Sequence, residues 1–444
     1  MNSILNILKK HSPSLPVNIG LMLAHIPFNL RPGIGELYKK QIKNIQEYPL
    51  LIESKKKELI YKSFFKVFSH AYSNIPYYTN LYKSIHHIEL GDIKSFEDIK
   101  AIPLTSKNML RDIPLEDRSF NIKNRLLVNT GGSSGKPFSF YMDPLRYGNE
   151  WAHIHSMWSV HGFKPTALKL NFDGRSSNVK PIHYDFVRNS LIVNIYANFA
   201  EIEKQLIEVF IKYKIEYLHG YPSAIYEFTK KCSKSDLLLK YFRVNLKACF
   251  LNSEYPSPHY RDKIEKTFKI PTQSFYGHTE TCVMAYESLP FEYVPYHTYG
   301  FAEAIEFNKQ FNLVGTSYFN FASPLIRYNT EDIIKPLNFK NDILDKFTIN
   351  EGRMADFILD ENDNKISLTG LIFGRHHLLF EHVDHIQVQQ IEKGKAIIYC
   401  ITDKELSINS LSDLFDASNV KIDFIFKHLK VPHKTTSGKI TLKI

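Results

Sequence analysis

Apolar positions change their spacing along this chain near residue 125. From 36 to 83 they recur at near-helical intervals, which predicts helices interrupted at Pro76. Beyond 125, short apolar runs alternate with helical stretches and with clusters of Gly, Asn, Ser and Pro. Strands are predicted at 125–128, 138–141, 168–172, 191–193, 217–219 and 248–252, and helices at 146–160, 202–214, 224–232 and 259–268. Such alternation is typical of an α/β architecture with a substantial sheet.

The length and a second change of texture predict two domains. A chain of 444 residues is ample for two or three domains. A polar stretch at 338–345 precedes Gly352-Arg353, and the residues after this pair read as short strands with one or two helices. We therefore predict a large domain with mixed sheets and helices at 1–352 and a small α+β cap domain at 353–444.

The formal net charge of +10 narrows the classes of partner. Lys and Arg are scattered, and the densest run, Lys55–Lys57, is typical of a solvated helix face. Without a recognition-helix, zinc-finger or RNA-binding pattern, nucleic acid is not an expected partner. Nucleotides and acidic metabolites fit the charge as well.

Cysteine spacing and apolar run lengths predict a cytoplasmic protein. The four cysteines are far apart and lack C-x-x-C spacing, which favours reduced thiols over disulfides or a zinc site. No run approaches the roughly 20 apolar residues that cross a bilayer, so no integral membrane segment is expected. The first residues are amphipathic and do not read as a signal peptide.

A Gly/Ser/Thr loop at 129–137 is the first candidate for chemistry. Its glycines allow close backbone approach to an anion, and its hydroxyls, backbone N–H groups and lysine can bind phosphate oxygens. Pro137 stands where the common P-loop needs Ser or Thr. Taken alone, the loop is equally compatible with a flexible turn. The candidate phosphate-binding residues are Thr130, Gly131, Gly132, Ser133, Ser134, Gly135 and Lys136.

Four further motifs follow this loop in a fixed order. They are Tyr276-Gly-His-Thr-Glu280, Ile326-Arg-Tyr-Asn-Thr-Glu-Asp332, Gly352-Arg353 and Thr436-Ser-Gly-Lys439. Together with the loop they resemble the signature segments of the adenylate-forming superfamily, which includes acyl-CoA synthetases, luciferases and peptide-synthetase adenylation domains. The local context at 74–78, 219–223, 252–254 and 323–328 is similar to the phenylacetate–CoA ligase branch, especially its capsular-polysaccharide type.

The resemblance implies a role for each motif residue. Tyr276 would stack on adenine, Asp332 would accept hydrogen bonds from the ribose, Arg353 would contact the nucleotide from the hinge side, and Glu280 would bind Mg²⁺. Lys439 would bring a positive charge to the α-phosphate and the attacking carboxylate. The resemblance also places these residues at the nucleotide: Ser253, Glu254, Gly277, His278 and Thr279.

Other side chains are candidates for the acyl pocket. They are His219, Tyr221 and His278, and either histidine is also a candidate base toward the second nucleophile. Each of these residues also has a purely structural interpretation. The histidines would be core residues, Asp332 and Arg353 would form ion pairs, and Lys439 would lie on a solvated tail. The motifs depart from the family at Gly131, which replaces Ser, and at Glu331, which replaces Gly.

These features predict an ATP- and Mg²⁺-dependent ligase that activates a small carboxylate as acyl-AMP. The expected acceptor is CoA, giving a thioester, with a place in surface-polysaccharide biosynthesis. One alternative is an amide-forming ligase that uses an amine, such as a sugar precursor or an amino acid. Another is a non-catalytic nucleotide-binding scaffold, which would not need Glu280, Asp332 and Lys439 together.

Overall fold

A computed structural model of the chain describes residues 16–30, 35–130, 138–172, 180–195, 197–351, 357–363, 365–372, 378–404, 411–417, 420–434 and 440–444. The chain divides into two compact units. The first comprises Met1–Ala24, Thr166–Ser274 and Asn350–Ile444, and the second comprises His25–Pro165 and Phe275–Ile349. Residues from Asn350 onward are thus grouped with 166–274, and the boundary expected at 352–353 stays a prediction.

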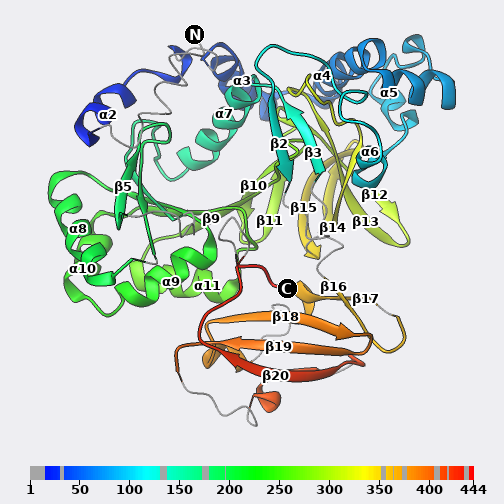
Figure 1. Cartoon of the computed structure of the whole chain (residues 1–444). Helices are drawn as coiled ribbons and strands as arrows, with labels where there is room; N and C mark the ends of the chain where they lie inside the picture. Colours follow the sequence, from blue (N-terminus) through cyan, green and yellow to red (C-terminus); the bar gives the residue numbers. More distant parts are fainter. Residues whose placement is uncertain are drawn as a thin grey trace. The chain divides into compact units, whose positions relative to one another are not determined.

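The first unit contains a mostly parallel sheet (Figure 1). Its strand order is β5-β6-β4-β7-β8-β9, with only β5 antiparallel to its neighbour among these pairs. The strands are β4 (Lys169–Phe172), β5 (Ile182–Asp185), β6 (Ser190–Val193), β7 (Tyr217–Gly220), β8 (Ala248–Leu251) and β9 (Thr272–Gly277). Strand β9 runs across the division into the second unit.

Four helices cover one face of this sheet. They are α8 (Phe199–Lys212), α9 (Pro222–Cys232), α10 (Asp236–Asn245) and α11 (Pro258–Phe268). Their apolar side chains, such as Leu206 and Phe228, share a buried cluster with Leu170 and Leu218 of the strands. Helix α9 begins with Pro at N1, and Ser235 caps α10 by accepting from Leu238 N. The short helix α2 (Val17–Ala24) also belongs to this unit.

The remaining part of the first unit holds a three-stranded sheet. Strand β19 (Lys395–Ile401) pairs antiparallel with β18 (His385–Glu392) and parallel with β20 (Asp423–Leu429). The hairpin β16 (Phe357–Leu359) and β17 (Lys365–Ser367) and the helix α12 (Leu368–Ile372) complete a small α+β core. The expected small C-terminal α+β structure is therefore confirmed.

The second unit is built on antiparallel pairing. Its sheet order is β9-β10-β11-β15-β14-β13-β12. The strands are β10 (Met284–Leu289), β11 (Glu292–Pro295), β12 (Gly300–Phe307), β13 (Gln310–Ser317), β14 (Tyr328–Lys340) and β15 (Ile343–Glu351). Strand β1 (Thr105–Ser106) pairs parallel with β14, and β2 (Leu126–Thr130) forms a hairpin with β3 (Phe138–Met142).

Helices of the second unit come from the N-terminal third of the chain. They are α3 (Gly35–Glu47), α4 (Glu53–Asn74), α5 (Pro76–Thr79), α6 (Lys107–Arg111) and α7 (Arg146–Ser159). One face of α4 buries Ile60, Phe64 and Phe68 against β-strand residues such as Phe301. The predicted interruption at Pro76 is confirmed, since Ile75 is extended and Pro76 starts α5.

The predicted α/β class and the ten predicted elements beyond 125 are confirmed within a few residues of their bounds. Among the described residues, no helix combines the length and apolar character needed to cross a bilayer. All four cysteines are buried and unpaired by disulfides.

Candidate functional site

Two predicted nucleotide-binding residues touch in the second unit. The Tyr276 hydroxyl, at the end of β9, donates a hydrogen bond to Oδ2 of Asp332 on β14 at 2.5 Å. Both side chains are largely buried, and the Tyr276 ring lies edge-on to Phe347 with 5.9 Å between centroids. The predicted adenine-stacking ring and the predicted ribose acceptor thus form one hydrogen-bonded pair, although they are 56 residues apart.

The residue before Asp332 has an unusual backbone conformation. Glu331 has a φ of 66°, in the left-handed region that favours glycine. Its N–H donates to Oδ1 of Asn329 at 2.9 Å, which closes a tight local turn. The departure noted in the sequence therefore lies at a position where the backbone itself suits Gly.

The loop between β9 and β10 holds Glu280 through His278. Nε2 of His278 accepts from the backbone N–H of Val283 at 3.3 Å, so the ring proton lies on Nδ1. That Nδ1–H faces Oε2 of Glu280 at 3.2 Å. The Thr281 N–H also donates to the His278 carbonyl at 3.1 Å, with Thr281 at a φ of 57°. His278 is thus engaged at both nitrogens and orients the carboxylate, while Thr279 is exposed.

Glu280 fits a magnesium ligand by its chemistry. It is a carboxylate with only 5% of the residue exposed, held in place by its neighbour. Within the described part of the chain, no cluster of three or more His, Cys, Asp or Glu side chains suits a metal. A single protein carboxylate is nevertheless compatible with Mg²⁺, which commonly binds through one or two carboxylates together with substrate phosphates and water.

His219 of the first unit is held in a neutral state. Its Nδ1 is 2.7 Å from Oδ1 of Asn171 on the neighbouring strand, so Nδ1 carries the proton and donates. Burial, reinforced by the positive charges of Lys169 and Arg188, lowers the pKa of His219 to about 3. A group with this pKa is a weak general base at neutral pH, which favours hydrogen bonding over proton abstraction as its role. Tyr221 follows as the N-cap of α9.

Glu254 joins two segments of the first unit. Its Oε2 accepts from the Ser223 N–H and its Oε1 from the Ser223 hydroxyl, both at 3.0 Å. Ser223 lies in the first turn of α9, where orphan N–H groups and the helix dipole favour an anion. Oε1 also accepts from the backbone N–H of Ile440 at 3.2 Å. The preceding Ser253 has a φ of 66°, which marks a sharp turn before Glu254.

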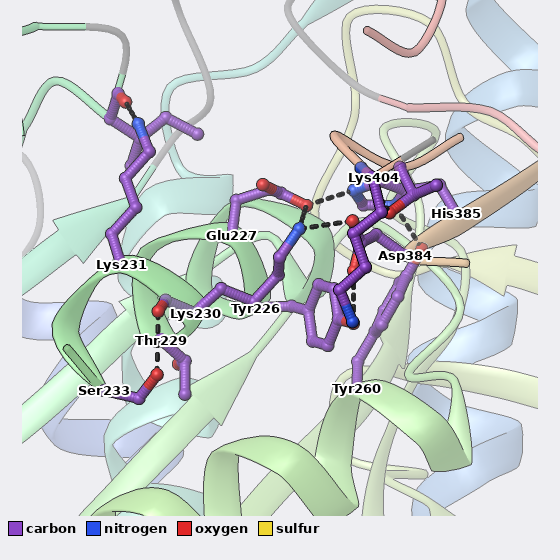
Figure 2. Close-up of polar contacts among 12 residues, drawn as sticks. Tyr226, Glu227, Thr229, Lys230, Lys231, Ser233, Tyr260, Asp384, His385 and Lys404 are labelled. Carbon is purple, nitrogen blue, oxygen red and sulfur yellow. Dashed lines mark hydrogen bonds and ion pairs between the residues drawn. The ribbon is translucent and has the colours of Figure 1, made fainter. Parts of the chain in front are cut away.

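A largely buried hydrogen-bond chain connects α9 and α11 to the start of β18 (Figure 2). Nε2 of His385 lies 2.6 Å from Oε1 of Glu227, and the Tyr260 hydroxyl lies 2.5 Å from Nδ1 of His385. A carboxylate only accepts, so Nε2 donates to Glu227. Burial raises the pKa of Glu227, but the hydrogen bond from His385 and nearby positive charges outweigh this and lower it overall.

The residue before His385 adds an ion pair to the same contact. Asp384 lies 2.5 Å from Nζ of Lys230 and accepts from the Tyr226 hydroxyl at 3.3 Å. Figure 2 shows these side chains of α9 pointing toward Asp384. No sequence motif indicated this cluster, because its pairs are distant in the chain, with separations of 125 residues for Tyr260–His385 and 158 for Glu227–His385.

Several predicted site residues lie outside the described part of the chain. They are Gly131, Gly132, Ser133, Ser134, Gly135, Lys136, Arg353 and Lys439. Thr130 ends β2, but its side chain is likewise outside the description. Their roles, and those of Gly277, Ser253 and the pocket residues, stay predictions.

No protein-family model matches the chain. It is 23% identical to Protein CapK of Staphylococcus aureus over 433 residues, which cover 92% of this chain and 91% of that protein. A solved 2-hydroxyisobutyryl-CoA ligase, in the postadenylation state with R3-HIB-AMP, superposes with a TM-score of 0.61 at 13% identity, covering 89% of this chain and 90% of the other. The chain has the fold of the adenylate-forming ligases.

A second solved structure extends this fold to amide-forming chemistry. The GH3.15 acyl acid amido synthetase superposes with a TM-score of 0.56 at 12% identity, covering 84% of this chain and 86% of the other. The fold expected from the sequence motifs is therefore confirmed. The same fold carries both a CoA ligase and an amido synthetase, so the fold by itself leaves the acceptor open.

Proposed function

We propose that the protein is an ATP-dependent ligase that activates a carboxylate as an acyl-AMP. The observation that carries the proposal is the Tyr276–Asp332 hydrogen bond, which joins the residue expected at adenine to the residue expected at ribose. Glu280, oriented by His278, lies on the loop that follows the strand of Tyr276. The similarity in fold to a ligase solved with an acyl-AMP supports the same chemistry.

In the proposed first step, a carboxylate oxygen attacks the α-phosphorus of ATP. A new O–P bond forms, the bond to the bridging oxygen breaks, and pyrophosphate leaves with the electron pair. Because two anions must meet, positioning and charge neutralisation dominate the barrier. Mg²⁺ held by Glu280 would neutralise charge on the leaving phosphates. Lys439 would place its positive charge at the α-phosphate.

The proposed second step transfers the acyl group to CoA. The thiolate of CoA attacks the acyl carbon, a C–S bond forms, and AMP leaves. Transfer to an amine of a sugar precursor or amino acid is the second candidate, which the similarity to an amido synthetase favours. A place in surface-polysaccharide biosynthesis is supported by the capsule-type motifs at 219–223 and 252–254 and by the similarity to Protein CapK.

Pyrophosphate release tests the proposal directly. The purified protein is incubated with ATP, Mg²⁺ and a panel of aryl, fatty, amino and sugar acids, and hydroxylamine traps any acyl-AMP as a hydroxamate. We expect carboxylate-dependent release that falls about 100-fold or more in Lys439→Ala, comparable to the loss of one transition-state charge contact. Equal rates in the two proteins across the panel would refute the mechanism. No release with any acid would favour a nucleotide-binding scaffold.

The acceptor is resolved with the acid that gives the highest rate. CoA and a set of amines, including amino sugars, are added separately after acyl-AMP has formed. A thioester with CoA assigns the first candidate, and an amide with an amine assigns the second. Product masses distinguish the two outcomes.

A further inference from the structure

We infer that Gln387 and Glu254 are positioning residues that hold the chain on either side of 435–439, the segment that contains Lys439. The inference rests on the proposed function, because it concerns how that function places its lysine. Gln387 binds backbone atoms on both sides of 435–439 and Glu254 binds one on the C-terminal side, and neither residue belongs to the C-terminal motif. Glu254 would then act through Lys439 rather than as a nucleotide ligand.

Gln387 binds residues on both sides of 435–439 with its side-chain amide. It lies on β18 and is fully buried. Its Oε1 accepts from the His433 N–H at 2.7 Å, and its Nε2 donates to the carbonyls of His433 at 2.9 Å and Thr441 at 2.8 Å. A primary amide offers one acceptor and two donors, and all of them are matched here. Few other side chains can satisfy this set.

Backbone pairing also fixes residues on both sides of 435–439. Lys434 and Ile440 form an antiparallel bridge directly on either side of 435–439. The following residues pair with β18: the Val388 N–H donates to the Leu442 carbonyl at 2.7 Å, and the Ile444 N–H donates to the Val388 carbonyl at 3.0 Å. The last residues of the chain are therefore fixed to β18 by backbone and side-chain contacts together.

Glu254 supplies the contact closest to the lysine in sequence. Its carboxylate accepts from the Ile440 N–H, and Ile440 directly follows Lys439. The same carboxylate is anchored to the first turn of α9 through Ser223. Glu254 therefore holds Ile440, the first described residue after 435–439. Through Glu254, α9 and the C-terminal segment share one anchor.

The His385–Glu227 contact reinforces the same arrangement. His385 lies on β18 two residues before Gln387, and side chains two apart share a face of a strand. Helix α9 is thus connected to residues 440–444 in two ways. One connection passes through Ser223 and Glu254, and the other passes through Glu227 and β18. A misplacement of a catalytic group by about 1 Å can reduce a rate by about 100-fold, so this bracing should be visible kinetically.

A double-mutant cycle with Lys439 tests the inference. Gln387→Leu and Glu254→Gln are each compared with the unchanged protein and with Lys439→Ala, using the best acid from the pyrophosphate screen. We expect each single variant to lower kcat by about 10- to 100-fold, while KM for ATP changes less than about threefold. In the Lys439→Ala background, neither substitution should lower the rate further.

Matched controls separate positioning from loss of folding. Gln389→Leu makes the same substitution two residues along β18, at an exposed side chain, and Glu208→Gln repeats the charge removal at an exposed side chain of α8. Both should keep kcat within about twofold, in line with ordinary surface substitutions. Additive losses in the Lys439→Ala background, or a rise in KM for ATP with unchanged kcat, would overturn the inference and make Glu254 a nucleotide contact.

A second measurement does not depend on activity. Hydrogen exchange is followed by mass spectrometry in peptides that cover 431–444, in the unchanged protein, Glu254→Gln and Gln389→Leu. Glu254→Gln should increase exchange in these peptides, because an uncharged amide oxygen accepts more weakly and can replace only one of the two carboxylate oxygens, and Gln389→Leu should not. Unchanged exchange in Glu254→Gln would overturn the bracing. An inactive unchanged protein with the expected exchange would instead refute the proposed function alone.

Discussion

At the scale of single residues, Glu331 shows how a departure from a motif acquires a physical meaning. Its φ of 66° is costly for a side chain with a Cβ and costs glycine little. We predict that Glu331→Gly raises the free energy of unfolding by up to about 1 kcal/mol, since relief of strain exceeds the added chain entropy. Urea unfolding measures the change. Lys335→Gly, on the same strand with an exposed side chain, is the control and should lower stability.

His278 acts at the same scale through the carboxylate it faces. Nδ1–H stands 3.2 Å from Glu280, and Nε2 accepts from Val283, so the ring orients the proposed magnesium ligand. We predict that His278→Leu raises the Mg²⁺ concentration for half-maximal pyrophosphate release by about 10-fold or more. His278→Gln, which keeps a donor, should recover part of the loss. An unchanged Mg²⁺ dependence in His278→Leu would contradict this role.

At the scale of elements, the contact between α9 and β18 should depend on Glu227. Its carboxylate accepts from His385, and removing its charge leaves a weaker hydrogen bond in a largely buried place. We predict that Glu227→Gln lowers the free energy of local opening of β18 by about 1–3 kcal/mol. Hydrogen exchange of peptides covering 384–390 measures this opening.

The folded pKa of Glu227 is lowered, which sets the pH direction of this contact. A carboxyl with a lowered pKa stabilises above its unfolded value near 4.3, and the contribution is lost as pH falls through the folded value. The protection of the 384–390 peptides, which is the intrinsic exchange rate at each pH divided by the observed rate, should therefore fall at acid pH in the unchanged protein. Glu208→Gln, at an exposed side chain of α8, should leave the protection of these peptides unchanged.

Sequence patterns predicted the parallel strands better than the antiparallel ones. Strands such as β8 (Ala248–Leu251) are buried along their whole length and read as continuous apolar runs. In contrast, β14 (Tyr328–Lys340) contains charged residues, Pro336 and an exposed end, so its sequence has no clear strand pattern. Pairing with the neighbouring strands stabilises it instead. The helix α10 was also absent from the prediction, since it is short and follows α9 closely.

The sequence predicted some residues of the candidate site but not the contacts that hold them. Local motifs indicated Tyr276 and Asp332, and the structure adds that they touch. Contacts such as Gln387–Thr441 and Glu227–His385 join segments without any shared motif, so only the folded chain reveals them. Hydrogen-bond partners that are distant in sequence produce no periodic pattern of residues, so sequence patterns do not predict these contacts.

At the scale of the whole molecule, buried neutral histidines recur in both units. Burial lowers the pKa of His153 to about 3 and that of His297 to about 4 in the second unit, and His219 in the first unit behaves alike. His153 illustrates why: its nitrogens meet the Asn149 carbonyl and the Thr298 hydroxyl, both at 2.8 Å, and no carboxylate is among these partners. Each ring must stay neutral for the native packing to persist.

These histidines predict that both units lose stability in mild acid. A histidine whose folded pKa lies below its unfolded value near 6.5 takes up a proton mainly when unfolded. Its stabilising contribution is complete above pH 6.5 and is lost as pH falls toward the folded value, at up to about 1.4 kcal/mol per pH unit for each ring. The urea midpoint should therefore fall steadily between pH 6.5 and 4.5. His153→Gln, which cannot titrate, should flatten that slope, and an unchanged slope in this variant would contradict the role of His153.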